Sequence, residues 1–241
     1  MISQDYHDQT ILITGAASGI GYAQMQTYLA AGARVLAVDQ QMITVQHPRL
    51  TNFQLNLTDE QAVSDWLLTL PPVDIFLSTA GVLDNFTPAT QTDLQTIKRV
   101  MAVNATAPIQ ITLHLLPQMI KRQSGMMIFM TSIAGQIAGG GGAAYTMSKH
   151  ALVGWMKQLA LDYAADGIRV NAIAPGAIDT PMNAADFAGD GAIARSVAAQ
   201  TPVRRWAQAQ EVADLTLYLT SPQASYMQGQ VVTLDGGWTI K

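Results

Sequence analysis

A glycine-rich turn between a predicted strand and a predicted helix constrains the fold of this chain more than any other feature. Residues 10–13 are β-branched or apolar, and Thr14-Gly15-Ala16-Ala17-Ser18-Gly19-Ile20-Gly21 follows them directly. Its three glycines allow a tight turn and a close approach of the backbone to a ligand. The helix that begins at Gly19 supplies free N–H groups and a positive dipole end. This strand–turn–helix unit therefore predicts a site for the pyrophosphate of a dinucleotide.

Strands and helices alternate along all 241 residues. We predict strands at 10–13, 34–38, 52–57, 74–78, 126–131, 169–174 and 230–234, and helices at 19–31, 58–70, 92–104, 108–122, 143–165 and 209–220. This order favours an α/β fold with a doubly wound, parallel, seven-stranded sheet and helices on both faces. The segment from Asp39 to Asn52 contains Pro48 and no apolar periodicity, so we expect an irregular connection there. No linker or repeat divides the chain, and we predict a single domain over residues 1–241.

Composition and charge exclude several classes of protein. Only 12% of the residues are charged and the net charge is −4, which argues against nucleic-acid binding. Cysteine is absent, and His47, His114 and His150 lack metal-ligand spacing, so we expect no metal site. No apolar run reaches about 18 residues, and residues 1–6 lack a signal-peptide pattern. We therefore expect a cytoplasmic protein with no membrane segment.

Asp39 ends the predicted second strand, about 20 residues beyond the glycine turn, as a dinucleotide site requires. Its carboxylate can hold both ribose hydroxyls of the adenosine and would repel a 2′-phosphate. Ser18, Gln40 and Gln41 supply no positive charge that would bind such a phosphate. These residues predict NAD(H) as the cofactor in preference to NADP(H).

Tyr145 and Lys149 lie four residues apart in a predicted helix, so both side chains point from one face. A neighbouring ammonium favours a phenolate, and we expect it to lower the pKa of Tyr145 from about 10. The pair can then exchange a proton with an alcohol or carbonyl oxygen. Ser132, at the end of an apolar strand, can hold that oxygen in place.

Several motifs along the chain match those of one family. They are Thr14–Gly21 for Thr-Gly-x-x-x-Gly-x-Gly, Ser78-Thr79-Ala80-Gly81 for Asn-Asn-Ala-Gly with two changes, Asn104 in Val103-Asn104-Ala105, the trio Ser132, Tyr145 and Lys149, Pro175-Gly176-Ala177-Ile178-Asp179-Thr180, and Asp235-Gly236-Gly237. On these motifs the chain resembles the short-chain dehydrogenase/reductase family over nearly its whole length. The resemblance implies a Rossmann fold and reversible hydride transfer between a nicotinamide and a substrate carbon.

The resemblance also implies a role for each matched residue. Tyr145 is expected to act as general acid in reduction and as base in oxidation, while Ser132 orients the substrate oxygen. Lys149 is expected to bond the nicotinamide ribose, and Asn104 to support a water that links Lys149 to solvent. The residues expected to bind the cofactor are Gly15, Ala17, Ser18, Gly19, Ile20, Gly21, Asp39, Gln40, Asn56, Leu57, Thr79, Ala80, Gly81, Tyr145, Lys149, Pro175, Gly176, Ile178 and Thr180.

The substrate is expected to bind among residues that follow the strand ends. Candidates are Val82, Leu83, Ile133, Gln136, the glycines at 139–142, and residues 182–206, where Met182, Phe187 and Trp206 are apolar. The four glycines indicate either a mobile rim or close backbone packing.

The preferred function is NAD(H)-dependent interconversion of a small secondary alcohol and a ketone. The alternative is a 3-oxoacyl-[acyl-carrier-protein] reductase, because the chain also resembles the enzymes of that subgroup. Those reductases tend to carry arginines where this chain has Met126 and Asp166, although Lys121, Arg122, Arg204 and Arg205 would compensate on a docking surface. A third reading, a non-catalytic redox sensor or scaffold, is disfavoured because Tyr145 and Lys149 are both present.

The family is usually tetrameric, through the helices at 104–122 and 145–165 and through the C-terminal strand. The second of these helices carries apolar residues beyond one stripe, namely Ala151, Leu152, Trp155, Met156 and Leu159. A second buried face fits an interface between identical subunits, so we expect a homotetramer or homodimer.

Overall fold

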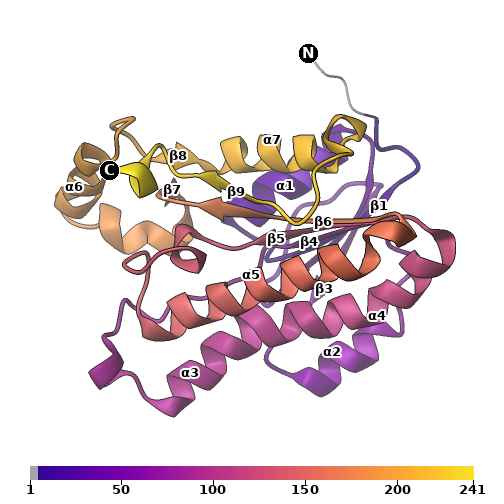
Figure 1. Ribbon diagram of the computed structural model, residues 1–241, viewed down its shortest axis with the longest axis horizontal. Helices are drawn as coiled ribbons and strands as arrows, with labels where there is room; N and C mark the ends of the chain where they lie inside the picture. The colour runs from indigo at the N-terminus through magenta and orange to yellow at the C-terminus, as the bar shows by residue number, and fades with distance from the viewer. Residues whose placement is uncertain (1–4) are drawn as a thin grey trace.

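The computed structural model describes residues 5–241 and contains a seven-stranded parallel sheet (Figure 1). The strands are β1 (Thr10–Thr14), β2 (Arg34–Asp39), β3 (Leu50–Gln54), β4 (Ile75–Ser78), β5 (Gly125–Met130), β6 (Ile168–Pro175) and β9 (Val231–Leu234), in the spatial order β3-β2-β1-β4-β5-β6-β9. This order confirms the predicted doubly wound Rossmann fold. Residues 1–4 of the N-terminal segment considered for a signal peptide lie outside the described residues.

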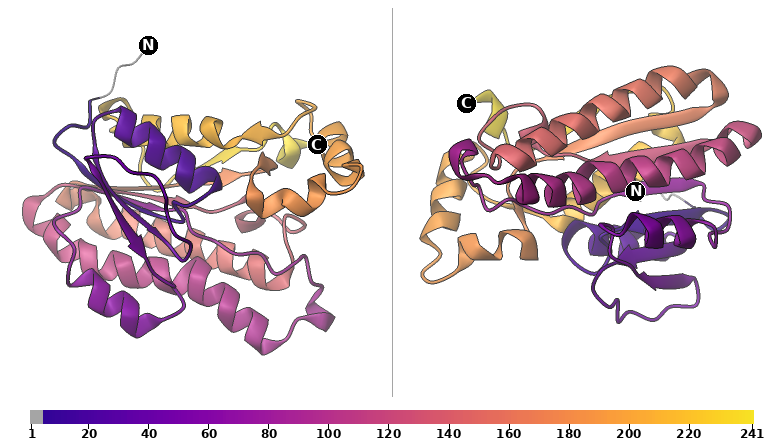
Figure 2. Two further views of the ribbon diagram at one scale, coloured as in Figure 1. Left: turned by 180° about the vertical axis from the view of Figure 1, so that it is seen from behind. Right: turned by 90° about the horizontal axis from the view of Figure 1, so that it is seen from below.

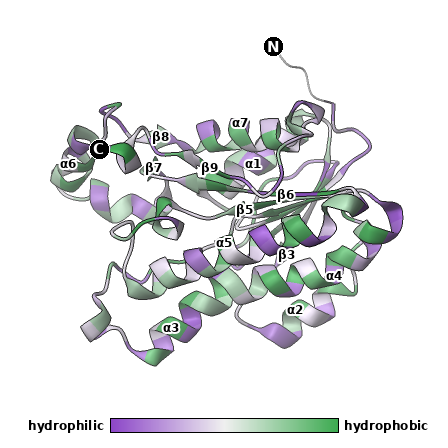
Figure 3. Ribbon diagram, in the orientation of Figure 1, coloured by the Kyte–Doolittle hydropathy of each residue, from purple (hydrophilic) through white to green (hydrophobic). Residues whose placement is uncertain are grey.

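Helices cover both faces of the sheet (Figures 1 and 2). One face is covered by α1 (Gly19–Ala30) and α7 (Ala209–Thr220), and the other by α2 (Glu60–Leu67), α4 (Ala107–Arg122) and α5 (Ala143–Tyr163). Along these outer helices, hydrophobic and hydrophilic residues are interspersed (Figure 3). Such mixing is expected of helices with one side on a sheet and the other facing outward.

Alternate side chains of β1 supply the two halves of the core. Leu12 packs into the cluster on the α4 and α5 side, together with Leu115. Ile11 and Ile13 pack into the cluster on the α1 and α7 side. Since successive side chains of a strand point to opposite faces, a continuous apolar run marks a strand that is covered on both.

The third strand lies earlier than predicted. β3 pairs with β2 from Leu50, opposite Val35, to Gln54, opposite Asp39, so the predicted bounds of 52–57 were wrong at both ends. β2 ends at Asp39, and beyond it the N–H of Leu55 makes one last bond to the carbonyl of Asp39. The connection between β2 and β3 contains no helix, as predicted.

The helices predicted at 92–104 and 108–122 form one continuous unit. α3 (Leu94–Met101) runs through a π-helical turn, Ala102–Thr106, into α4. The separate start predicted at Pro108 was therefore wrong. Pro108 lies in the first turn of α4, where the π turn already rearranges the backbone bonds, so its missing N–H does not end the helix.

A smaller lobe follows β6 on the side of the sheet's carboxyl ends. It contains β7 (Ile178–Asp179), a 3₁₀ segment at Pro181–Phe187, α6 (Ala192–Gln200) and β8 (Ala207–Gln208), and β7 pairs with β8. Within residues 5–241, no helix has both the length and the apolar character needed to cross a bilayer.

Candidate active site

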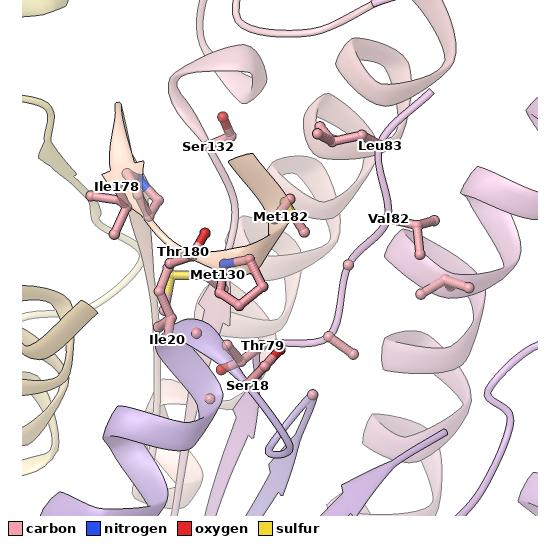
Figure 4. A pocket seen from close by; sticks show the side chains of 18 of the residues that line it. Ser18, Ile20, Thr79, Val82, Leu83, Met130, Ser132, Ile178, Thr180 and Met182 are labelled. Carbon is pink, nitrogen blue, oxygen red and sulfur yellow. The ribbon is translucent and has the colours of Figure 1, made fainter. Parts of the chain in front are cut away.

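A cavity of about 510 Å³ lies at the carboxyl ends of the strands (Figure 4). Its walls come from the glycine turn after β1, the end of β2, residues 79–83 after β4, residues 130–132 at the end of β5, and residues 175–183 after β6. β1 and β4 are neighbours in the sheet, and the strand order reverses between them. Open α/β sheets bind ligands at this reversal point, so the cavity occupies the expected place for a dinucleotide.

The glycine turn is shaped for a close backbone approach. Gly15 has φ of +75°, and a Cβ there would lie 2.8 Å from the Cα of Ala80. A Cβ on Gly21 would overlap the carbonyl of Gly15. Ser18 is the N-cap of α1 but makes no side-chain cap bond, and Gly19 and Ile20 line the cavity. These features fit a pyrophosphate held by the first turn of α1.

Asp39 lies on the cavity wall and is bound to the glycine turn. Its Oδ2 accepts from the N–H of Ala17 at 3.0 Å, and its Oδ1 accepts from the N–H of Gln41 at 2.9 Å. Ala17 itself does not line the cavity, and its N–H is bound to Asp39, so its contact with the cofactor stays a prediction. All the other predicted cofactor residues line the cavity.

Asn56 uses its side-chain oxygen within its own turn. Oδ1 accepts from the N–H of Thr58 at 3.0 Å and from its hydroxyl at 2.9 Å. Because an amide oxygen has two acceptor positions, both are filled. The NH₂ group of Asn56 is therefore the part of its side chain that is left to bond a ligand in the cavity.

Thr79, which stands in place of a family asparagine, is held by a buried polar chain. The hydroxyl of Thr14 accepts from the N–H groups of Thr79 and Ala80, both at 3.2 Å. The hydroxyl of Thr79 donates to Gln24 at 2.6 Å, and Gln24 donates to Thr216 at 2.9 Å. The chain links the cavity wall to α1 and α7, so the threonine keeps a fixed position here.

Ser132, Tyr145 and Lys149 come together at the cavity from two elements. Ser132 follows β5, and its Oγ accepts from the N–H of Ala134 at 3.1 Å. Tyr145 and Lys149 occupy one face of α5, with Nζ 5.4 Å from the centroid of the tyrosine ring. The ammonium donates to the carbonyl of Met130 at 2.9 Å, which fixes it beside the end of β5.

The pKa values of this pair are controlled by burial. The pKa of Tyr145 is raised to about 12, mainly by burial. The charge of Asp84 also raises this pKa, and a hydrogen bond with Ser132 partly offsets the rise. Burial lowers the pKa of Lys149 from 10.5 to about 8. The expected lowering of the tyrosine pKa was therefore wrong, because desolvation of the phenolate outweighs the hydrogen bond with Ser132. At neutral pH Tyr145 is a protonated hydroxyl that can donate to a carbonyl oxygen.

Asn104 lies in the π turn behind the cavity. Its Oδ1 accepts from the N–H of Val82 at 2.8 Å, and its Nδ2 donates to the carbonyl of Val82 and to the hydroxyl of Ser148, both at 3.0 Å. Asn104 thus ties the loop after β4 to α5. The water that it is predicted to support stays a prediction.

Asp84 is a residue of the site that the sequence analysis did not predict. It is only 1% exposed, and its carboxylate accepts from the N–H groups of Gly142 and Tyr145, at 3.0 and 2.9 Å. Gly142 is the N-cap of α5 and has no side chain to cap it. A helix start without a Ser, Thr, Asp or Asn was the available signal that a distant acceptor caps it.

The glycines before α5 serve close packing. A Cβ on Gly141 would overlap the ring of Tyr145, and a Cβ on Gly142 would lie 2.5 Å from the carboxylate of Asp84. Gly139 has φ of +93° with open space around it. Of the two readings of this tract, close backbone packing therefore holds for Gly141 and Gly142.

The substrate end of the cavity differs in part from the prediction. Val82, Leu83, Gly140, Met182 and Asn183 line it as expected, and Asn85 and Phe86 join them. Ile133, Gln136, Phe187 and Trp206 do not line it. Ile133 is buried, and the side chain of Gln136 is hydrogen-bonded to Thr233. The rings of Phe187 and Trp206 pack on each other, with 4.8 Å between their centroids.

The sheet, the glycine cradle, and the serine, tyrosine and lysine at one cavity define a dinucleotide-binding oxidoreductase. The family described as enoyl-(acyl carrier protein) reductase matches residues 15–239. The chain is 32% identical to 3β-hydroxysteroid dehydrogenase 2 of Eggerthella lenta, over 96% of this chain and 95% of that protein. The protein belongs to the short-chain dehydrogenase/reductase family, and it is an NAD(P)-dependent enzyme that acts on CH–OH groups.

Solved structures show the same architecture. A 4-hydroxyisoleucine dehydrogenase complexed with NADH matches with a TM-score of 0.91 at 29% identity, over 97% of this chain and 99% of that one. A proposed NAD(P)-dependent gluconate 5-dehydrogenase from Beutenbergia cavernae, with bound NADP, matches with a TM-score of 0.91 at 31% identity, over 98% and 99% of the two chains. The cofactor of this family member is a nicotinamide dinucleotide.

Proposed function

We propose that the protein interconverts a secondary alcohol and a ketone with NAD(H), and that Tyr145 is the general acid and base. The observation that carries this proposal is the protonated, buried Tyr145 at a cavity that Ser132 and Lys149 also line. The nicotinamide, when bound, supplies or accepts the hydride. In reduction the hydroxyl of Tyr145 gives its proton to the carbonyl oxygen, while Ser132 donates a hydrogen bond to that oxygen. In oxidation Tyr145 takes the proton back.

The preference for NAD(H) is supported by the charges on the cavity wall. Of the described lining residues, Asp39 and Lys149 alone are charged. Lys149 bonds Met130 beside the catalytic tyrosine, at the other end of the cavity from Asp39. A 2′-phosphate beside Asp39 would therefore meet a carboxylate and no cation, whereas two ribose hydroxyls can donate to that carboxylate.

An uncharged, partly apolar substrate is supported by the residues at the other end. Val82, Leu83, Phe86 and Met182 are apolar, and Asn85 and Asn183 are neutral. A substrate carboxylate or phosphate would be desolvated there, and Lys149, already bonded to the carbonyl of Met130, is the one cation among the described lining residues. The name of the Eggerthella relative, a hydroxysteroid dehydrogenase, is consistent with an uncharged secondary alcohol.

The 3-oxoacyl-carrier-protein reductase remains the second candidate, because the matching family description also names a reductase of acyl-carrier-protein substrates, although an enoyl reductase. Its compensating cations are partly engaged within this chain. Arg122 lies 3.7 Å from Asp74, Arg205 is paired with Glu211 at 2.7 Å, and Arg204 donates to the carbonyl of Ala199. Arginines already paired inside the chain are weaker docking groups for an acidic partner.

Turnover of uncharged alcohols, polyols, ketones and acyl thioesters with both cofactors tests this proposal. With the best substrate, kcat/KM for NADH is expected to exceed that for NADPH at least about tenfold, equivalent to about 1.4 kcal/mol. Uncharged ketones are expected to react faster than acetoacetyl thioesters. Faster turnover of the thioesters with NADPH would instead support the carrier-protein reductase.

The variant Asp39→Asn tests whether Asp39 causes the preference for NAD(H). The amide oxygen can still accept from the N–H of Ala17, while the negative charge and the acceptor for the N–H of Gln41 are lost. The ratio of kcat/KM for NADH over NADPH is expected to fall in this variant. An unchanged ratio would show that Asp39 does not select the cofactor.

We also propose a homotetramer or homodimer. Leu113 on α4 and Leu161 on α5 are 56% and 76% exposed, on the two helices expected at the interface. Large exposed apolar side chains on neighbouring helices favour association. Light scattering with size exclusion is expected to give two or four times the chain mass, and Leu161→Glu is expected to lower it. A monomeric wild-type protein would refute this proposal.

A further inference from the structure

Asp84 is a buried carboxylate held by backbone groups. It lies between β4 and α3, and none of the ion pairs in the described chain involves it. Its partners are the N–H of Gly142, bound to Oδ1, and the N–H of Tyr145, bound to Oδ2. Both lie about 60 residues further along the chain, so the contact is tertiary and not a local cap. A carboxylate at this position is stabilised by the positive end of the 21-residue helix α5.

One of these bonds is made by the main chain of the tyrosine itself. Because Oδ2 accepts from the N–H of Tyr145, the carboxylate fixes where the backbone of Tyr145 lies relative to β4. The second bond holds Gly142, next to the residue whose backbone packs on the tyrosine ring. The position of the phenol at Ser132 therefore depends on both contacts.

The main-chain carbonyl of Asp84 holds the loop that forms the rim of the cavity at its substrate end. Its carbonyl accepts from the N–H of Thr87 at 3.2 Å and from the hydroxyl of Thr87 at 2.6 Å, which closes a tight loop. Asn85 and Phe86, inside this loop, both have φ of +55° and both line the cavity. Left-handed backbone at Phe86 is unfavourable for an aromatic residue and persists only where surrounding contacts hold it.

We propose that Asp84 is a positioning residue that couples the Asn85–Phe86 rim to Tyr145. Its carboxylate holds the first turn of α5, and its main chain holds the loop that contacts substrate. A shift of the rim therefore changes the position of the phenol, and the reverse also holds. This inference rests on the proposed role of Tyr145 as the acid and base.

The negative charge of Asp84 gives the proposal a second readout. The charged groups around Tyr145 are Asp84 from the β4–α3 loop and Lys149 from α5, with the neutral Ser132 after β5. Arg99 of α3 reaches the same loop and donates to the carbonyl of Leu83 at 3.1 Å. The charge of Asp84 disfavours the phenolate, so its removal is expected to lower the pKa of Tyr145.

Asp84→Asn tests the proposal, because the side chain keeps its shape but loses its charge and one acceptor. We expect kcat for ketone reduction to fall about ten- to hundredfold, the range of a displacement of about 1 Å at a reacting group. KM for the ketone is expected to rise, and the Kd of NADH to stay unchanged. The rising limb of the pH profile for alcohol oxidation is expected to move to lower pH. Asp59→Asn, the same change at the N-cap of α2, is expected to leave kcat and the pH profile unchanged.

Gly142→Ala provides an independent variant that keeps the charge. The added Cβ would displace the carboxylate of Asp84, so kcat is again expected to fall. Gly154→Ala, on the same helix and with open space around its Cβ, is the control and is expected to retain full activity. If folded Asp84→Asn and Gly142→Ala both keep the wild-type kcat and pH profile, the proposal is wrong. Wild-type protein without alcohol or ketone turnover would instead refute the proposed function.

Discussion

Replacing Tyr145 with phenylalanine is expected to lower kcat about 10³-fold in both directions, within the range of about 10²–10⁴ for loss of a general acid and base. The hydroxyl is the only group removed, and the ring can keep its packing against Gly141. The pKa of about 12 means that this hydroxyl carries its proton at neutral pH, so its loss removes the proton donor for ketone reduction. Steady-state kinetics with the best ketone, together with NADH binding by fluorescence, measures the effect.

Tyr163→Phe is the matched control for this prediction. Tyr163 lies at the end of the same helix, and its ring packs on the core. It is expected to keep wild-type kcat. A Tyr145→Phe variant that binds NADH normally and retains full activity would exclude Tyr145 as the acid and base. Wild-type protein that binds NADH without turning over any substrate would favour the redox sensor or scaffold.

Lys149→Met is expected to abolish turnover and yet to stabilise the fold. Lys149 is 3% exposed, and its ammonium has the carbonyl of Met130 as its hydrogen-bond partner. Burial lowers its pKa from 10.5 to about 8, which corresponds to a cost of roughly 3 kcal/mol for the charged form. Removing the charge also removes the hydrogen bond, worth about 1 kcal/mol. The net gain in the free energy of unfolding is therefore expected to be about 2 kcal/mol at neutral pH.

This gain is expected to depend on pH. Below pH 8 both the folded and the unfolded chain hold the proton on Lys149, so the full cost of the buried charge is present. Between pH 8 and pH 10.5 the unfolded chain binds more protons, so the stability contribution of the wild-type lysine rises with pH. The advantage of Lys149→Met is therefore expected to shrink across this window and to disappear above it.

Urea denaturation at pH values below and within this window measures the difference. Lys157→Met, an exposed lysine two turns along the same helix, is the control and is expected to change stability by less than about 0.5 kcal/mol. If Lys149→Met is instead less stable than Lys157→Met, the buried ammonium is better compensated than its contacts indicate.

The buried strands of the sheet were predictable because each follows from a local pattern. The apolar run before Gly15 and the wholly apolar stretch that became β5 each identify a strand buried on both faces. The bounds of β3 were not predictable in the same way. β3 is an edge strand, so its ends are determined by register against β2 and not by its own pattern of burial.

The glycine turn and the four-residue spacing of Tyr145 and Lys149 were determined by the sequence alone. Both depend only on backbone geometry within a few residues, and this local geometry does not change with the position of the segment in the fold. They were sufficient to predict a dinucleotide next to a proton donor.

The tertiary structure alone decided three further properties of the site. It brought Asp84 to the first turn of α5, it linked Thr79 to Gln24, and it reversed the expected direction of the tyrosine pKa. Each depends on contacts between segments distant in the chain or on the amount of water excluded from a side chain. Neither quantity is encoded in local spacing, because burial and long-range partners arise only when the whole chain packs.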